Sequence, residues 1–310
     1  MFGLTKDTKK HLRILLYGQA GSGKSSFINS VDSVCQNRIT CPAAASSIGH
    51  TVTFTYKTYR IEKEVEGQYY PFVFNDVMGL EGTKGVREED IKHAMQGHLE
   101  EGYKFNAASA FCPSDERYHK KPDINDKSDI LVCVVRSDTG TMLKDDALDK
   151  MRRITTAARD YGIPQMAILT HIDDACPLVK ESIQNVHKSK YIKTKMEQLH
   201  NELGIPLSNI FPVKNYHEEI DLDGDIDMLI LRAMRQIIQI AKDQAVLGEY
   251  LLRGRCQRYG RQTRPPKKEE WLSIARVPAT FLPGDVESAI TYAAVAALHS
   301  KILSVLGAGQ

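Results

Sequence analysis

Short apolar runs alternate with longer amphipathic segments along the chain. Buried strands are predicted at 12–17, 70–75, 129–135, 165–169 and 209–213, and a further strand at 51–61, which is rich in Thr, Tyr, Val and Phe. Helices are predicted at about 24–34, 87–101, 145–161, 178–203 and 226–251. Because strands alternate with helices, we expect a three-layer α/β sandwich with a mostly parallel sheet covered on both faces.

The sequence changes character after residue 252. Basic residues and a Pro265–Pro266 pair gather between 253 and 268, which is typical of a linker. An apolar helix is predicted to follow from Asp285, a suitable N-cap, to Leu306. We therefore predict a domain at 1–252 and a basic linker with a short helical extension at 253–310.

Composition and charge narrow the class of protein. The chain has 310 residues and a formal net charge of +2, which gives no overall attraction to nucleic acid. The six cysteines have no zinc-site spacing, so we expect free thiols in a reducing compartment. No run of eighteen uncharged apolar residues occurs, and we place the protein in the cytoplasm.

A glycine loop follows the first predicted strand and precedes the first helix. Residues 18–25, GQAGSGKS, match the phosphate-binding pattern G-x-x-x-x-G-K-S/T in the context that it requires. Backbone N–H groups and the helix N-terminus would hold phosphates, Lys24 would reach the β- and γ-phosphates, and Ser25 would bind Mg²⁺. The predicted phosphate site comprises Gly18, Gly21, Ser22, Gly23, Lys24, Ser25 and Ser26.

A second motif follows the strand at 70–75. Asp76-Val77-Met78-Gly79 fits D-x-x-G, in which the Asp holds Mg²⁺ through water and the Gly N–H contacts the γ-phosphate. A magnesium-binding threonine is expected upstream, and the sequence leaves Thr53 and Thr51 open. Together with the glycine loop, this motif predicts a P-loop NTPase of the G-domain-like type.

Two further segments predict which nucleotide base the protein binds. Thr170-His171-Ile172-Asp173 follows a buried strand where GTPases usually have N/T-K-x-D. The Asp173 carboxylate would accept the guanine N1–H and exocyclic amine, a pair of donors that adenine lacks. His171 replaces the Lys and could stack on the base. Asn215, after the last strand, stands where a loop usually contacts the guanine oxygen.

The residues around these motifs argue against rapid turnover. Leu80 follows Gly79, near where many fast GTPases carry a Gln that orients the attacking water. Arg38 is a weak candidate for an arginine finger. We therefore expect a protein that binds GTP or GDP with Mg²⁺ and hydrolyses GTP slowly or not at all. Alternatives are an interaction scaffold without turnover and a P-loop ATP-dependent enzyme.

Five segments together resemble the interferon-induced protein 44 family. They are residues 18–30 (GQAGSGKSSFINS), 56–59 (YKTY), 76–80 (DVMGL), 97–106 (GHLEEGYKFN) and 169–173 (LTHID). The GYKFN segment is specific to the family, since a generic GTPase has no need of it. The resemblance covers about residues 10–250. It implies a cytoplasmic GTP-binding-like domain with a role in the interferon, immune or antiviral response, and the family's own His accounts for His171.

The sequence is compatible with more than one kind of binding partner. Paired nucleotide faces are common in related GTPases, so a nucleotide-dependent homodimer is one hypothesis, and we expect no nucleic acid partner. The basic residues at 253–268 and the apolar helix after them could contact anionic membrane. We favour packing of that helix on the domain or on a protein partner.

Overall fold

The apolar runs form one six-stranded sheet in the order β2-β3-β1-β4-β5-β6. Its strands are β1 (Leu12–Gly18), β2 (Lys57–Glu62), β3 (Tyr69–Asp76), β4 (Ile130–Arg136), β5 (Gln165–Thr170) and β6 (Ile210–Pro212). Only the β2–β3 pair is antiparallel, and the other neighbours are parallel. The mostly parallel sheet predicted from the sequence is confirmed, and β1 lies at its centre, next to β3 and β4.

The structure is a computed structural model that describes residues 11–43, 55–80, 85–106, 108–138 and 145–257. Of residues 145 and 245–257 it describes the backbone alone. Thr51 and Thr53, the two candidate magnesium ligands, lie outside the described residues, as do residues 258–310 of the predicted extension.

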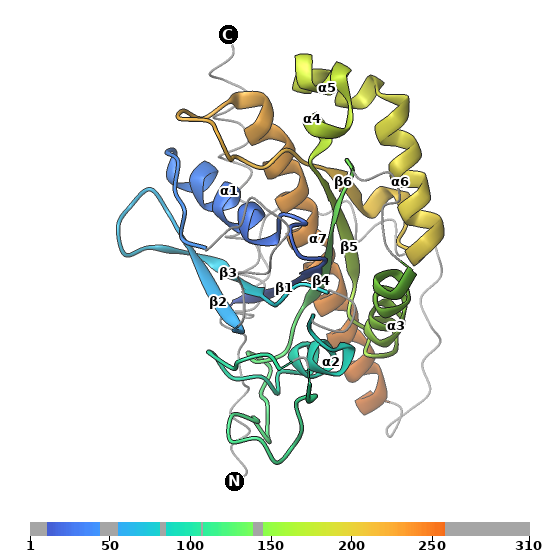
Figure 1. Cartoon of the computed structure of the whole chain (residues 1–310). Helices are drawn as coiled ribbons and strands as arrows, with labels where there is room; N and C mark the ends of the chain where they lie inside the picture. Colours follow the sequence, from blue (N-terminus) through green and yellow to red (C-terminus); the bar gives the residue numbers. More distant parts are fainter. Residues whose placement is uncertain (1–10, 44–54, 81–84, 107, 139–144, 258–310) are drawn as a thin grey trace.

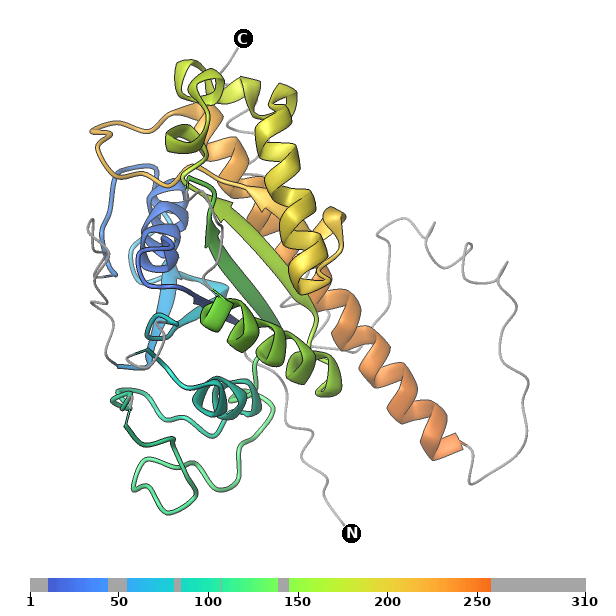
Figure 2. The same cartoon turned by 45° about the vertical axis from the view of Figure 1, so that its right-hand side comes forward.

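The sheet has a hydrophobic core on each face because successive side chains of a strand point to opposite sides. Ile14 and Leu16 of β1 pack beneath α1 (Lys24–Gln36) and α7 (Gly224–Gln257). Leu15 and Tyr17 pack toward α2 (Glu88–Gln96), α3 (Asp145–Asp160) and α6 (Lys190–Leu203). The two helical layers are visible on either side of the sheet in Figures 1 and 2.

The segment at 178–203, predicted to be mostly helical and to end at Gly204, is confirmed, and the structure divides it into separate helices. The structure has four short elements there and just before: α4 (Ile172–Ala175), α5 (Pro177–Glu181), the 3₁₀ helix η1 (Ile183–Lys188) and then α6. Ser182 and Ser189, which flank η1, both have extended backbone. The Ser189 hydroxyl accepts a hydrogen bond from Ile192 N and thereby caps α6. Serine competes with helix continuation in this way because its side chain bonds nearby backbone groups.

Helix α2 is shorter than the predicted 87–101. It ends at Gln96 because Gly97 adopts a left-handed conformation with φ of 84°. A Cβ atom at this glycine would lie 2.8 Å from the backbone and side chain of Asp126, so the close approach of these segments also needs glycine. The later segment around 126 therefore passes directly against the end of α2.

The described residues between 97 and 128 connect α2 to β4 as a long loop. Tyr56 N donates to Tyr103 O and Gly102 N donates to Tyr56 O, both at 2.8 Å, so the GYKFN segment pairs with the chain leading into β2. Phe111 N donates to the buried Asp90 of α2 at 2.8 Å. The loop is thus attached both to the approach to β2 and to the first turns of α2.

Helix α7 is longer than the predicted 226–251. The carboxylate of Asp223 caps it by accepting hydrogen bonds from Asp225 N and Ile226 N. The helix continues to Gln257, past the predicted boundary at 252, and extends beyond the sheet in Figure 2. Within the described part of the chain, no helix combines the length and apolar character needed to cross a bilayer.

Asp90 gives a testable pH dependence of stability. Burial raises the pKa of this fully buried carboxyl to about 6, against an ordinary value of 3.8, although the hydrogen bond from Phe111 N opposes the shift. The folded protein therefore binds more protons than the unfolded chain between about pH 4 and 6, and stability falls as the pH rises through that window. Asn at position 90 does not ionise, so Asp90→Asn should keep the stability that wild type loses as the pH rises. We expect the free energy of unfolding of the variant, minus that of wild type, to rise by up to about 3 kcal/mol over this window.

Urea denaturation at a series of pH values measures this difference. Asp149→Asn is the matched control, because that side chain is 60% exposed on α3. Parallel curves for wild type and Asp90→Asn would contradict the prediction.

Candidate functional site

The glycine loop lies at the carboxyl edge of the sheet, between the end of β1 and the start of α1. Gly23 has a φ of 89°, and a Cβ atom there would lie 2.8 Å from the Asn215 amide nitrogen. Gly23 therefore permits both the turn into α1 and the close approach of the loop after β6. The strand–loop–helix context predicted for residues 18–25 is present.

Lys24 begins α1 and folds back along the loop. Its ammonium donates to the carbonyl oxygens of Gln19 at 3.1 Å and Gly18 at 3.4 Å, and the residue is only 6% exposed. Burial among carbonyl groups holds the charge beside the concave side of the loop. An ammonium in this position can reach phosphate oxygens by exchanging carbonyl partners for them.

Ser25 and Asp76 come together from different parts of the fold. The Ser25 hydroxyl donates to an Asp76 carboxylate oxygen at 2.6 Å, which joins the first turn of α1 to the end of β3. Both groups offer hard oxygen atoms, the donors that Mg²⁺ prefers, so the pair fits the ion that the motifs imply. The carboxylate is fully buried at the strand end.

Gly79 places the segment after β3 directly against the glycine loop. A Cβ atom at Gly79 would lie 2.5 Å from Ala20 N, so a larger residue would force the two backbones apart. Leu80 N donates to Gly18 O at 2.9 Å. The predicted D-x-x-G motif thus lies against the glycine loop, with Leu80 buried in the core.

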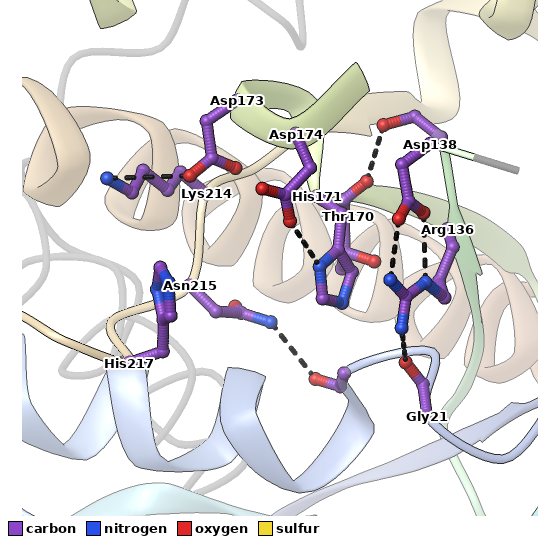
Figure 3. Close-up of polar contacts among 12 residues, drawn as sticks. Gly21, Arg136, Asp138, Thr170, His171, Asp173, Asp174, Lys214, Asn215 and His217 are labelled. Carbon is purple, nitrogen blue, oxygen red and sulfur yellow. Dashed lines mark hydrogen bonds and ion pairs between the residues drawn. The ribbon is translucent and has the colours of Figure 1, made fainter. Parts of the chain in front are cut away.

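Thr170 is a supporting residue of the loop. Its buried hydroxyl donates to Ser22 O at 2.7 Å, which ties the end of β5 to the glycine loop. Thr170 O accepts hydrogen bonds from the backbone and hydroxyl of Ser137 (Figure 3). The structure therefore assigns Thr170 a positioning role at the site that the sequence predicted for it.

A cavity of about 530 Å³ opens beside the loop, and Gly21, Gly23, Ser26, His171, Asp173 and Asn215 are among its lining residues. Each of these six residues was predicted from the sequence to bind nucleotide. The cavity lies against the start of α1, where a chain of phosphates held by the loop would continue into sugar and base. Its volume lies in the range of ordinary small-molecule sites.

Figure 3 shows His171, Asp173 and Asn215, three residues that line this cavity. His171 has a left-handed backbone with φ of 54°, and its ring nitrogen lies 3.2 Å from an Asp174 carboxylate oxygen. Asn215 donates to Gly23 O at 3.1 Å. Asp173 contacts Lys214, with 3.5 Å between the ammonium and a carboxylate oxygen.

Several residues of the site escaped the sequence analysis. Arg136, at the end of β4, makes a two-pronged ion pair with Asp138 and donates to Gly21 O at 3.2 Å. The hydrogen bonds from Arg136 lower the pKa of Asp138, against the raising effect of burial. Glu219 pairs with Lys214 at 2.8 Å. A signal for Arg136 existed, since it directly follows a predicted central strand, where ligands of parallel sheets bind.

Arg38 does not support the arginine-finger hypothesis in this structure. Its guanidinium donates to the Gln36 side chain at 2.6 Å, in an exposed pair after the end of α1. Arg38 is absent from the residues that line the described cavity, whereas its neighbours Ile39, Thr40 and Cys41 line it. Among the described residues that line the cavity, the arginine is Arg136, which donates to Gly21 O of the loop.

Comparison with known proteins identifies relatives at moderate identity. Interferon-induced protein 44-like of Homo sapiens is 32% identical over 239 residues, which are 76% of this chain and 53% of that protein. Interferon-induced protein 44 of Mus musculus is 31% identical over 237 residues, 76% of this chain and 56% of that protein. The human protein of the same name is 31% identical over 235 residues, with coverage of 76% and 53%. The chain thus spans about half the length of the curated relatives that it matches.

Other comparisons add little. No family model matches the chain. The crystal structure of an SsGBP mutation variant aligns with 66% of this chain and 50% of that chain at 14% identity, and its TM-score of 0.31 is too low to support an inference. The identity to curated relatives over 76% of this chain, together with the segments that first suggested the resemblance, shows that the chain belongs to the interferon-induced protein 44 family.

Proposed function

We propose that this protein binds a guanine nucleotide with Mg²⁺ and hydrolyses GTP slowly or not at all. The observation that carries the proposal is the convergence of separate strand ends on one glycine loop. Asp76 ends β3, Thr170 ends β5, and both contact the loop or the first turn of α1 that follows it. Such convergence at the carboxyl edge of a parallel sheet is how nucleotide sites of this class are built.

The phosphates are proposed to bind between the glycine loop and the N-terminus of α1. The first helical N–H groups lack partners within the helix and carry partial positive charge, which favours a phosphate there. Lys24 adds a full positive charge to the same side of the loop. Ser25 and Asp76 would hold Mg²⁺, which supplies charge neutralisation between phosphate oxygens.

The base is proposed to occupy the cavity bounded by His171, Asp173 and Asn215. The Asp173 carboxylate accepts the N1–H and exocyclic amine of guanine, for which adenine offers no equivalent pair of donors. The ring of His171 offers a flat surface at the cavity wall. Selective binding of ATP would instead favour an ATP-dependent enzyme.

Slow hydrolysis follows from the chemistry around Gly79. Leu80 is 1% exposed and packs into the hydrophobic core, so its side chain neither reaches nor could polarise an attacking water. Fast GTPases use a polar side chain for that purpose. The alternative is an interaction scaffold that binds nucleotide without turnover. Single-turnover hydrolysis measurements distinguish such a scaffold from a slow GTPase.

The family relationship supports a role in the interferon-induced immune or antiviral response, which we propose for this chain together with a cytoplasmic location. A nucleotide-dependent homodimer is part of the proposal, with protein partners still to be identified. We also propose the division into a nucleotide-binding domain at 1–252 and an extension at 253–310.

Lys24→Ala tests the phosphate site. Removal of the ammonium should weaken binding of a fluorescent GTP or GDP analogue by roughly 100-fold, because charge-assisted hydrogen bonds to phosphate are lost. Fluorescence titration in the presence of Mg²⁺ measures the effect.

Lys193→Ala is the matched control, since that side chain is 77% exposed on α6. Equal affinity of Lys24→Ala and wild type would rule out phosphate binding by the loop. Equal affinity of wild type for ATP and GTP analogues would remove the guanine assignment while leaving the phosphate site in place.

Ser25→Ala tests the magnesium site. In wild type, GTP binding should strengthen by about tenfold on replacing EDTA with Mg²⁺, and in Ser25→Ala most of that gain should disappear because a hard oxygen ligand is missing. Isothermal titration with and without the metal measures both affinities. A metal effect of equal size in both proteins would show that Ser25 is no ligand.

A further inference from the structure

Three charged side chains from two segments meet at the base end of the cavity. Lys214 follows β6, and its ammonium lies 3.5 Å from an oxygen of Asp173 in α4 and 2.8 Å from an oxygen of Glu219. All three side chains are largely buried, with 18% of Lys214, 13% of Asp173 and 21% of Glu219 exposed. The Lys214–Asp173 contact is drawn in Figure 3.

Glu219 is held firmly by its own loop. One carboxylate oxygen accepts hydrogen bonds from His217 N at 2.9 Å and Glu218 N at 3.2 Å, and the other pairs with Lys214. Burial raises the pKa of Glu219, but the hydrogen bonds from Lys214 and from the backbone of His217 and of Glu219 itself lower it to about 2. The carboxylate is therefore an ionised anchor for Lys214 at physiological pH.

Lys214 in turn remains charged. Burial lowers its pKa, but the hydrogen bond from Lys214 to Glu219 and the charge of Asp173 outweigh burial and raise it. The ammonium joins the loop after β6 to α4. An exposed ion pair would contribute little, but these partly buried groups are less screened by water and hold a more definite geometry.

The surroundings of Asp173 make such an anchor necessary. Asp174, Glu218 and Glu219 also line the cavity, so this end of the site is rich in carboxylates that repel one another. Among the described residues that line the cavity, Arg136 is engaged by Asp138, and the His171 ring contacts Asp174. The ammonium that contacts Asp173 is that of Lys214.

We propose that Lys214 and Glu219 are positioning residues that orient the Asp173 carboxylate and thereby set selectivity for the exocyclic amine of a purine. Lys214 itself is outside the cavity lining, so it acts through Asp173 and not by contact with the base. The inference rests on the proposed guanine-nucleotide function and deepens it. Without Lys214, the carboxylate loses its fixed orientation and its hydrogen bond to the amine weakens.

Inosine diphosphate isolates this effect, because its base keeps the C6 carbonyl oxygen and N1–H of guanine but lacks the amine on C2. Competition against a fluorescent GDP analogue gives the affinities of GDP, inosine diphosphate and ADP for each variant. In Lys214→Met, which retains most of the side-chain length, we expect GDP affinity to fall about tenfold while inosine diphosphate changes less than about threefold. Glu219→Gln should shift the same ratio in the same direction and by less, since Lys214 remains.

Lys214→Arg should restore most of the preference for GDP, because it returns the positive charge. Lys193→Met on the exposed face of α6 is the control for loss of a lysine. Thermal unfolding of each variant identifies any that fails to fold, in which case Glu219→Gln carries the test.

The outcomes separate the inference from the proposed function. An equal loss of GDP and inosine diphosphate affinity in Lys214→Met would reduce the residue to a structural role, and an unchanged ratio in both variants would overturn the inference. Wild type that binds ADP as well as GDP, or binds none of the three, would overturn the proposed function and the inference with it.

Discussion

The site depends on one constraint, which is that the carbonyl groups of the glycine loop need hydrogen-bond donors from the surrounding fold. Buried carbonyls are costly without partners. Here they are supplied from across the fold: Leu80 N reaches Gly18, Arg136 reaches Gly21, the Thr170 hydroxyl reaches Ser22, and Asn215 reaches Gly23. The conformation of the loop therefore depends on hydrogen bonds from four parts of the fold: the ends of β4 and β5 and the segments after β3 and β6.

This arrangement divides the site into two ends with different electrostatics. The proposed phosphate end gathers Lys24, the N-terminus of α1 and the Ser25–Asp76 pair, which suits an anion with a divalent cation. The proposed base end gathers carboxylates, three of which pair with an arginine or a lysine: Asp138 with Arg136, and Asp173 and Glu219 with Lys214. The hydrogen bonds from Arg136 lower the pKa of Asp138 and those from Lys214 lower the pKa of Glu219, whereas burial raises the pKa of Asp90 in α2.

The family-specific segment has a structural position that a generic nucleotide site would not need. Residues 97–128 pair with the chain before β2 through Tyr56 and Tyr103 and are bonded to α2 through Phe111 and Asp90. Within this loop, the ring of Phe111 packs in a tilted arrangement against the rings of Tyr103 and Tyr118. The loop consequently joins the approach to β2 to the helix that follows the D-x-x-G motif.

Much of this protein was determined by the sequence alone: the alternating strands and helices, the glycine loop, and Asp76, Thr170, His171 and Asp173 at predicted strand ends. These signals are local, because hydrophobic period, glycine spacing and strand ends can be read within a few residues. What only the tertiary structure decided depends on distant contacts. The end of α2 against Asp126, and the Arg136–Gly21 and Asp173–Lys214–Glu219 contacts, join residues that no short pattern relates. Their geometry exists only once the strands are ordered side by side, since the order β2-β3-β1-β4-β5-β6 is what brings those strand ends to one edge.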